Sequence, residues 1–292
     1  LLRAGVASAA RWPAFAEELG LADAYRACGT LVVARDADAA EALERERALR
    51  ERLGLRVTRL RGSAARRLEP GLAPGVRCAL EAPDDHAVDP RDLVTALVAA
   101  CEREGVTLRA GHPGPPAAGR VVLATGAWAG APVRPVKGQI LFLRDPDGPG
   151  LVDRVIRHGA HKAGGLGSGF YLVPRGDGRY VLGATMEERG FDTTVTAGAM
   201  RELLEEAQLV VPGIDELIVE EAAAGLRPGT PDNAPLIGAR EDGTLLAAGH
   251  HRNGILLAPL TADAVAALLA GEQPPAEVVP FSPARFAEVA AR

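Results

Sequence analysis

The chain has 292 residues, of which 47% are hydrophobic and 4% aromatic, and this is an ordinary composition for a globular protein of one large or two medium domains. Its formal net charge of −5 comes from interspersed charges, so the sequence gives no reason to expect a nucleic acid or an anionic membrane as a partner. No apolar run approaches the ~20 residues needed to span a bilayer, and the opening residues do not read as a signal peptide.

The cysteines and histidines do not indicate a metal centre. Cys28, Cys78 and Cys101 are odd in number and lack ligand spacing, so we expect reduced thiols in a cytoplasmic protein. The six histidines are scattered, and His250 and His251 have no carboxylate or cysteine partner at ligand spacing. The sequence also lacks the G-x-S-x-G motif, so it offers no nucleophile for serine hydrolysis.

Helix and strand patterns follow one another over the first hundred residues. Residues 1–20 predict a helix, residues 29–35 have the β-branched content of a strand, and residues 36–54 have the pattern of an amphipathic helix. Residues 88–105 predict a further helix, because Asp89 is placed as its N-cap and a proline follows at the first helical position.

The middle of the chain predicts strands. Residues 106–111 and 120–130 each have the pattern of a strand, and the second contains Thr125 and Gly126, where small residues would let the backbone lie close to a cofactor. Residues 171–185 predict a β-hairpin, since Gly-Asp-Gly separates two β-rich runs.

One more predicted strand, residues 133–144, carries polar side chains among apolar ones. Arg134, Lys137 and Gln139 either point at a cofactor or form the polar side of an edge strand, and the sequence leaves both interpretations open.

The C-terminal stretch, residues 225–259, has the arrangement that delivers site residues in α/β enzymes. A buried strand at 245–248 stops at a glycine, and a largely apolar helix begins at Gly254. The first N–H groups of such a helix lack intrahelical partners and favour an anion or an electron-rich ring edge. Arg227 and Arg252 lie on the two approaches to this point, where a guanidinium could hold the carboxylate of a small acid.

A resemblance to a known family rests on five sequence blocks: GLRPGTPDNAPLIG, AAGHHRNGILLAP, YLVPRGDGRYVLGATMEERGFD, VRPVKGQILFLR and VVLATGAWAG. Together they resemble the D-amino-acid oxidase family of FAD-dependent amine oxidases, most closely the glycine oxidases of thiamine biosynthesis. The resemblance covers most of the chain, and the two C-terminal blocks are its specific part.

The resemblance implies an α/β and α+β fold with two discontinuous domains. An FAD-binding Rossmann-like domain would be formed by residues 1–28, 88–131 and 225–292, and a substrate domain built on a large mixed β-sheet by residues 29–87 and 132–224. No strand is followed by the G-x-G-x-x-G loop that holds a dinucleotide pyrophosphate. We therefore expect an N-terminally truncated form that lacks the first βαβ unit and binds FAD poorly as it stands.

The resemblance also implies the site residues. Arg227 would bind the amino acid carboxylate, Arg252 would flank the same site, Tyr171 would close over the substrate, and Met186 would limit a small pocket. The residues expected at the flavin are His250, His251, Arg252, Asn253, Gly254, Ile255, Leu256, Thr125 and Gly126.

The implied reaction is oxidative deamination of glycine or a small amino acid. A hydride would pass from the α-carbon to FAD, the resulting imine would hydrolyse to the oxo acid and ammonia, and dioxygen would be reduced to hydrogen peroxide. The implied partners are the amino acid and dioxygen, and a homo-oligomer is left open. Two alternatives stay open: a related oxidase or dehydrogenase of sarcosine or small D-amino acids, and a non-catalytic truncated fragment unable to hold FAD.

Overall fold

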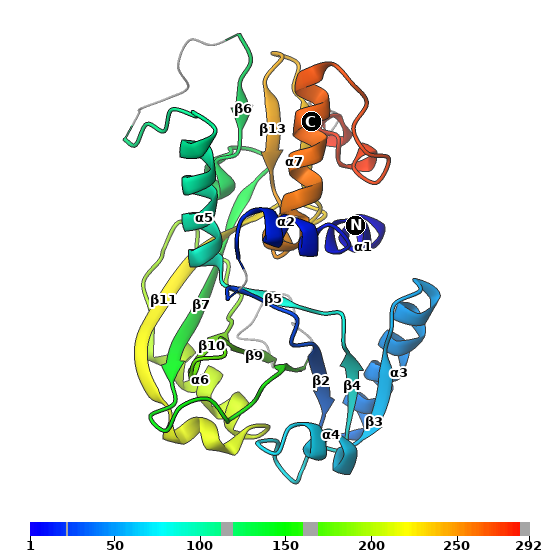
Figure 1. Ribbon diagram of the computed structural model, residues 1–292, viewed down its shortest axis with the longest axis vertical. Coiled ribbons are helices and arrows are strands. Elements are labelled where there is room, and N and C mark those ends of the chain that lie inside the picture. The colour runs from blue at the N-terminus through cyan, green and yellow to red at the C-terminus, as the bar shows by residue number, and fades with distance from the viewer. Residues whose placement is uncertain (22, 112–118, 160–168, 287–292) are drawn as a thin grey trace.

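The computed structural model describes residues 1–21, 23–111, 119–159 and 169–286 (Figure 1). The helices in these ranges are α1 (Leu2–Ala9), α2 (Trp12–Glu18), α3 (Ala37–Arg52), α4 (Gly62–Leu68), α5 (Pro90–Arg103), α6 (Ala197–Gln208) and α7 (Gly254–Ala270). The strands are β1 (Tyr25–Arg26), β2 (Thr30–Ala34), β3 (Thr58–Arg61), β4 (Cys78–Ala82), β5 (Ala87–Val88), β6 (Val122–Leu123), β7 (Arg134–Arg144), β8 (Val155–His158), β9 (Phe170–Pro174), β10 (Arg179–Gly183), β11 (Ile218–Gly229), β12 (Leu236–Ala239) and β13 (Leu245–Ala248).

An eight-stranded sheet forms the lower half of the molecule in Figure 1, in the order β11-β7-β10-β9-β8-β2-β4-β3. Strands β2 and β8 pair in parallel, whereas the other neighbours in this sheet are antiparallel. The large mixed sheet that was predicted for the substrate domain is therefore confirmed.

A smaller sheet lies in the upper half, in the order β12-β13-β6, with α7 beside β13 (Figure 1). Here β13 pairs in parallel with β6 and antiparallel with β12. The parallel pair followed by a helix is the α/β part of the expected fold. How residues divide between two domains stays a prediction. The predicted boundary between residues 224 and 225 falls inside β11, which pairs with β7 on both sides of it.

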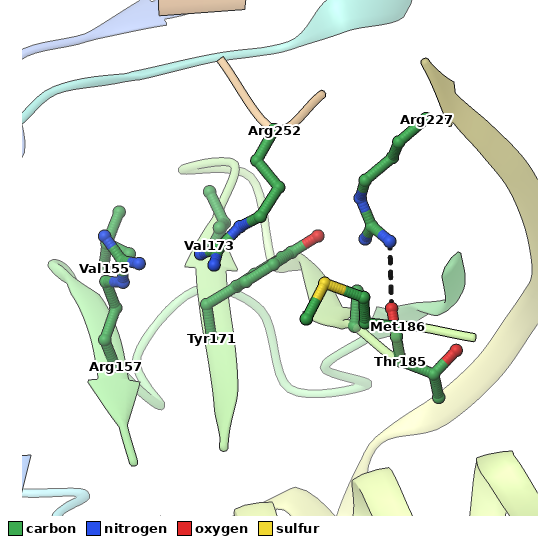
Figure 2. A pocket seen from close by; sticks show the side chains of 9 residues that line it. Val155, Arg157, Tyr171, Val173, Thr185, Met186, Arg227 and Arg252 are labelled. Carbon is green, nitrogen blue, oxygen red and sulfur yellow. Dashed lines mark hydrogen bonds between the residues drawn. The ribbon is translucent and has the colours of Figure 1, made fainter. Parts of the chain in front are cut away.

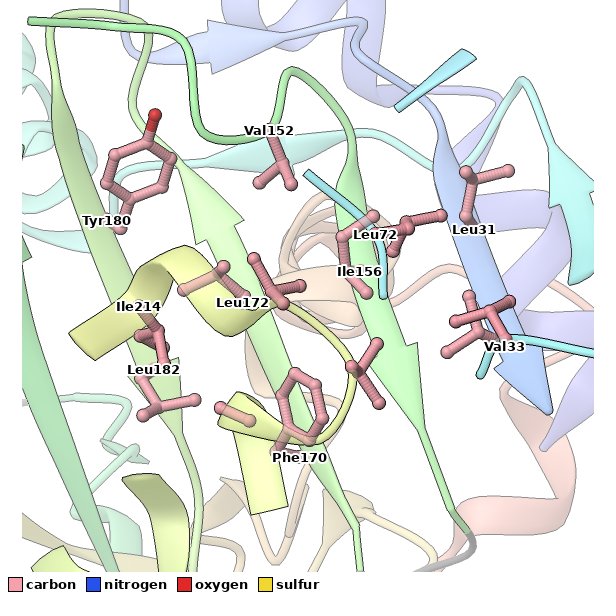
Figure 3. Packing of buried hydrophobic residues seen from close by; sticks show 14 of the residues in the cluster. Leu31, Val33, Leu72, Val152, Ile156, Phe170, Leu172, Tyr180, Leu182 and Ile214 are labelled. Atoms are coloured by element: carbon pink, nitrogen blue, oxygen red, sulfur yellow. The ribbon is translucent and has the colours of Figure 1, made fainter. Parts of the chain in front are cut away.

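The main hydrophobic core lies on one face of the eight-stranded sheet, between its strands and the segment around α6 (Figure 3). Side chains alternate along each strand, so Ile156 of β8, Leu172 of β9 and Leu182 of β10 are fully buried in this core. The residues next to them in sequence must then face the other side of the sheet. That opposite side carries the candidate site.

The predicted hairpin and both of the predicted helices with clear end signals are confirmed. β9 and β10 pair antiparallel, with Tyr171 opposite Gly183. The side chain of Asp89 caps α5 by accepting a hydrogen bond from the N–H of Arg91 at 2.9 Å. Helix α7 begins at residue 254 and ends at Gly271, whose φ of 80° is the left-handed conformation that glycine adopts easily.

The predicted strand at residues 106–111 is wrong. These residues form no ladder with any described strand, and Val106 and Leu108 are each 50% exposed. A strand is stabilised by cross-strand pairs, so an apolar alternation without a neighbouring strand does not form one.

The N-terminal helices are fixed to the first turn of α7. The carbonyl of Leu256 accepts hydrogen bonds from the Ser8 hydroxyl at 2.6 Å and from the Trp12 indole at 3.1 Å. These contacts hold the start of α7, where several of the predicted site residues lie. Among the described helices, none has the length and apolar character needed to cross a membrane.

Candidate active site

A cavity of about 330 Å³ opens on the face of the large sheet opposite the main core (Figure 2). It is lined by Val155, Arg157, Tyr171, Val173, Ala184, Thr185, Met186, Arg227 and Arg252. These residues come from β8, β9, the segment after β10, β11 and the loop that joins β13 to α7. Five segments of the chain therefore meet at this cavity, with the β13–α7 loop above the strands in Figure 2.

The guanidinium of Arg227 is held in a fixed place. Its Nη1 donates to the carbonyl of Thr185 at 3.0 Å, the bond drawn in Figure 2, and lies 3.4 Å from the carbonyl of Lys137. It also lies directly over Gly138, because a Cβ built on that glycine would be 2.2 Å from Nη1. Burial lowers the pKa of Arg227, so its charge is partly desolvated and would be stabilised by an anion.

Tyr171 depends on a second glycine. A Cβ on Gly183, which is opposite Tyr171 in the hairpin, would be 2.5 Å from the phenol oxygen. Figure 2 shows the Tyr171 hydroxyl pointing toward Arg227, with Met186 beside it. Burial raises the pKa of Tyr171, and the nearby arginines oppose this effect. The hydroxyl is therefore a neutral donor next to a cation.

A second cavity, of about 670 Å³, adjoins the first, since Arg157, Met186 and Arg252 line both. The remaining residues around it are Leu1, Arg134, Val136, Glu188, Asn233, His251, Asn253 and Leu256. Its lining therefore includes the end of the β13–α7 loop and the first turn of α7.

The backbone around this second cavity leaves donors free for a ligand. The N–H of His251, a residue with a φ of 50°, donates to the carbonyl of Pro228 at 2.8 Å. Within the described residues, no backbone carbonyl accepts from the N–H groups of Gly254, Ile255 or Leu256. A helix N-terminus with free donors suits the electron-rich edge of a large planar ring. Of these three residues Leu256 lines the cavity, so the cavity lies against the first turn of α7, and a flavin there would fit beside His251, Arg252, Asn253 and Leu256.

The structure brings all four predicted substrate residues, Tyr171, Met186, Arg227 and Arg252, to the first cavity. Of the residues expected at the flavin, His251, Arg252, Asn253 and Leu256 line the second cavity. The others, His250, Gly254, Ile255, Thr125 and Gly126, do not line either cavity, and their contact with a cofactor stays a prediction. His250 is buried, and its Nε2 lies 3.0 Å from the Thr261 hydroxyl.

Two of the polar residues of β7 face away from the site. The buried Lys137 forms an ion pair with Asp192 at 2.7 Å, and the buried Gln139 donates to Glu187 at 2.7 Å. The interpretation that they point at a cofactor is therefore wrong, and so is the edge-strand interpretation, because β7 lies between β11 and β10. Arg134 does line the second cavity, where it pairs with Glu188 at 3.2 Å.

Sequence reasoning missed Arg157. This residue lies on β8 opposite Tyr171 of β9, and it lines both cavities. The available signal was a charged residue inside a short apolar strand, where alternation places Val155 and Arg157 on one face and Ile156 on the other.

The fold and the two adjoining cavities are typical of an enzyme that holds a small ligand beside a large cofactor. A family model makes this class specific, since the model described as DAO, FAD dependent oxidoreductase, matches residues 1–268. The chain belongs to this family, and FAD is the family's cofactor.

Several relatives are similar to this chain. The bifunctional protein ThiO/ThiG of a Synechocystis species is 37% identical over 244 residues, which are 75% of this chain and 36% of that protein. The chain thus spans about a third of the length of this relative. The glycine oxidase of Geobacillus kaustophilus is 33% identical over a match that covers 94% of this chain and 79% of that protein.

Solved structures agree with these relatives. The crystal structure of the glycine oxidase from Geobacillus kaustophilus superimposes with a TM-score of 0.86 at 32% identity, covering 97% of this chain and 82% of that one. The glycine oxidase from Bacillus cereus gives a TM-score of 0.83 at 27% identity, covering 93% of this chain and 81% of that one.

Proposed function

We propose that the whole protein oxidatively deaminates glycine or another small amino acid with FAD as its cofactor. The observation that carries the proposal is the Arg227 guanidinium, fixed by Thr185 and Gly138 on a small cavity that also holds Tyr171 and Met186. The glycine oxidases among its relatives support the choice of substrate. We also assign the reaction to thiamine biosynthesis, an assignment that the relatives named ThiO/ThiG support.

In the proposed reaction an amine, water and dioxygen give an oxo acid, ammonia and hydrogen peroxide. When bound, FAD supplies the two-electron acceptor that this oxidation needs. Arg227 binds the substrate carboxylate through charge-assisted hydrogen bonds, and the Tyr171 hydroxyl donates a further hydrogen bond beside it. Met186 and the Tyr171 ring limit the space around the α-carbon without adding charge.

A second candidate function is oxidation or dehydrogenation of sarcosine or a small D-amino acid by the same site. The observation that favours it is the uncharged wall that Met186 and the Tyr171 ring give the first cavity, because the unbranched methionine side chain can yield to an additional methyl group. Oxygen uptake and peroxide release with glycine, sarcosine and D-alanine, compared as kcat/KM, separate the two functions.

Replacing Arg227 tests the proposal. In the FAD-loaded protein Arg227→Ala should raise KM for glycine by roughly 10- to 150-fold, because a carboxylate loses a charge-assisted bond of about 1.5–3 kcal/mol. Arg227→Lys should recover part of this loss, since an ammonium lacks the planar fork of a guanidinium. Unchanged kinetics in both variants would remove Arg227 from the substrate site.

A further inference from the structure

The segment that follows β10 brings two groups to the first cavity. The backbone carbonyl of Thr185 accepts a hydrogen bond from Arg227 at 3.0 Å, and Met186 lines the cavity. The Thr185 side chain takes another direction, since Figure 2 shows its hydroxyl pointing away from Arg227. The place of the Thr185 carbonyl therefore depends on what holds this segment on the side away from the cavity.

A hydrogen-bonded group on that side holds the segment. The Glu187 carboxylate accepts from the Thr185 hydroxyl at 2.6 Å and from the Gln139 amide nitrogen at 2.7 Å. The Thr185 hydroxyl in turn accepts from the backbone N–H of Gln139 at 2.9 Å. Thr185 and Gln139 are buried, so water is a poor substitute for these partners. Glu187 thus binds the side chain of Thr185 and the strand β7 together.

The Gln139 side chain connects this group to α6. Its amide oxygen accepts from the N–H of Thr196, the N-cap residue of α6, at 2.8 Å. The amide oxygen and the amide nitrogen of Gln139 therefore both have partners, and the residue is 0% exposed. A buried polar network whose members are all satisfied is rigid. Gln139 therefore presents its amide nitrogen to Glu187 in one orientation.

The backbone of Glu187 reaches the second acceptor of Arg227. It forms an isolated antiparallel bridge with Lys137 of β7, in which the N–H of Glu187 donates to the Lys137 carbonyl at 2.9 Å. That carbonyl lies 3.4 Å from Nη1 of Arg227. Glu187 is thus bonded to both residues whose carbonyls face the guanidinium, although it lines neither the first cavity nor the second.

We propose that Glu187 is a positioning residue of the substrate site, which sets the Arg227 guanidinium through the carbonyls of Thr185 and Lys137. The inference rests on the proposed function, in which Arg227 holds the substrate carboxylate. A charge-assisted hydrogen bond requires close distance and good alignment, so a guanidinium whose acceptors have moved binds a carboxylate less well.

A crystal structure of the Glu187→Ala variant tests this geometry without turnover. The distance from Nη1 of Arg227 to the Thr185 carbonyl, 3.0 Å in the parent chain, should lengthen beyond the ~3.2 Å range of protein hydrogen bonds. The matched control is Glu205→Ala, which removes a carboxylate of α6 that is 59% exposed and should leave the distance unchanged. The same distance in the parent chain and in Glu187→Ala would overturn the proposal.

Kinetics of the FAD-loaded protein test the consequence. Glu187→Ala should raise KM for glycine about three- to ten-fold with a smaller change in kcat, because weaker carboxylate binding affects the ground state and the transition state alike. Glu187→Gln should keep KM near the parent value, since its amide oxygen can accept both hydrogen bonds. Glu205→Ala should also keep it. A rise in KM as large in Glu187→Gln as in Glu187→Ala would overturn the acceptor role and with it the proposal.

A double-mutant cycle shows whether Glu187 acts through Arg227. Glu187→Ala added to Arg227→Ala should raise KM no further, because the group that it positions is gone. Additive rises would assign Glu187 to general stability and overturn the proposal. If Arg227→Ala alone leaves KM unchanged, or no amine is oxidised, the proposed function fails, and the Nη1 distance in the crystal structure still decides whether Glu187 positions Arg227.

Discussion

Two glycines determine where the functional groups of the site can lie. Gly138 leaves the space that the Arg227 guanidinium occupies, and Gly183 leaves the space for the Tyr171 phenol. Neither glycine has a positive φ, so an alanine could adopt the backbone conformation at both positions. The reason for glycine is the close approach of a neighbouring side chain.

This predicts that Gly138→Ala impairs substrate binding without unfolding the protein. The new Cβ would be 2.2 Å from Nη1 of Arg227, the far end of a flexible side chain, so the guanidinium should move and the strand should stay. KM for glycine should rise about ten-fold or more, since displacement weakens a charge-assisted bond. Steady-state kinetics and thermal melting of the same preparations measure both effects.

The matched control for this variant lies on the next strand. Gly225 of β11 pairs with Gly138 of β7, and a Cβ built on Gly225 meets no atom within 4 Å. Gly225→Ala should therefore keep KM near its parent value. If both variants change KM equally, a general effect on the sheet explains the loss and the steric role of Gly138 is refuted.

Met186 is expected to limit the size of the substrate. It lines both cavities, so Met186→Ala should enlarge the space beside Tyr171 and raise kcat/KM for a bulkier D-amino acid relative to glycine. The expected gain in this ratio corresponds to a free-energy difference on the order of 1–3 kcal/mol, the range for a methylene-sized change in a pocket. A fixed ratio together with a lower Tm would instead assign Met186 to packing.

At the scale of elements, Arg157 lies in the site because it is part of β8. A buried carboxylate binds the two residues immediately before that strand. Glu69, which is 1% exposed, accepts hydrogen bonds at 3.0 Å from the backbone N–H groups of Asp153 and Arg154. It also pairs with the Arg154 side chain at 3.0 Å. One side chain thereby satisfies two backbone donors and a cation immediately before β8.

Removing this carboxylate should destabilise the fold. We expect Glu69→Ala to lower the free energy of unfolding by on the order of 3 kcal/mol, because it leaves donors and a charge without their partner. Urea unfolding measures the change. Glu41→Ala, which removes a carboxylate that is 74% exposed, is the control and should cost about 0.5 kcal/mol or less. Equal losses in the two variants would contradict the role given to Glu69.

The elements that could be predicted from the sequence are those specified by local signals. Asp89 and its following proline mark the start of α5, Gly271 marks the end of α7, and Gly-Asp-Gly marks the hairpin. The site residues found this way, such as Arg227, lie in blocks that also carry the family resemblance.

The contributions that could not be predicted depend on pairing between distant strands. Arg157 reaches the site because β8 lies between β2 and β9, a neighbourhood that no local pattern encodes. Lys137 and Gln139 face away because the strand period of two sends them to the side opposite Gly138 and Arg227. A one-residue change in register would have exchanged these faces.

At the scale of the whole molecule, the charge is unevenly distributed. The chain has a net charge of −5, yet the first cavity gathers three arginines and no carboxylate among its lining residues. The chain as a whole therefore gives no hint of an anion site. The local cluster arises when folding brings β8, β11 and the β13–α7 loop together.

The stability of the molecule should fall in mild acid because of a buried histidine. Burial lowers the pKa of His250 from 6.5 to about 4. The unfolded chain then binds more protons than the folded one between these values, so stability is fully present above pH 6.5 and is lost as the pH falls toward 4. At ~1.36 kcal/mol per pKa unit, the loss from His250 is on the order of 3 kcal/mol.

Unfolding by urea at several pH values between 7 and 4 measures this slope. His250→Gln should flatten it, although His251, whose pKa is also lowered to about 4 by burial, keeps part of it. The pKa of Asp232 is lowered from 3.8 to about 2 with the help of Arg285. The stability that Asp232 contributes is therefore lost only below pH 3.8, outside the range of the measurement. His86→Gln, at an exposed histidine, is the matched control. A slope that is the same in the parent chain and in His250→Gln would show that the acid sensitivity comes from other groups.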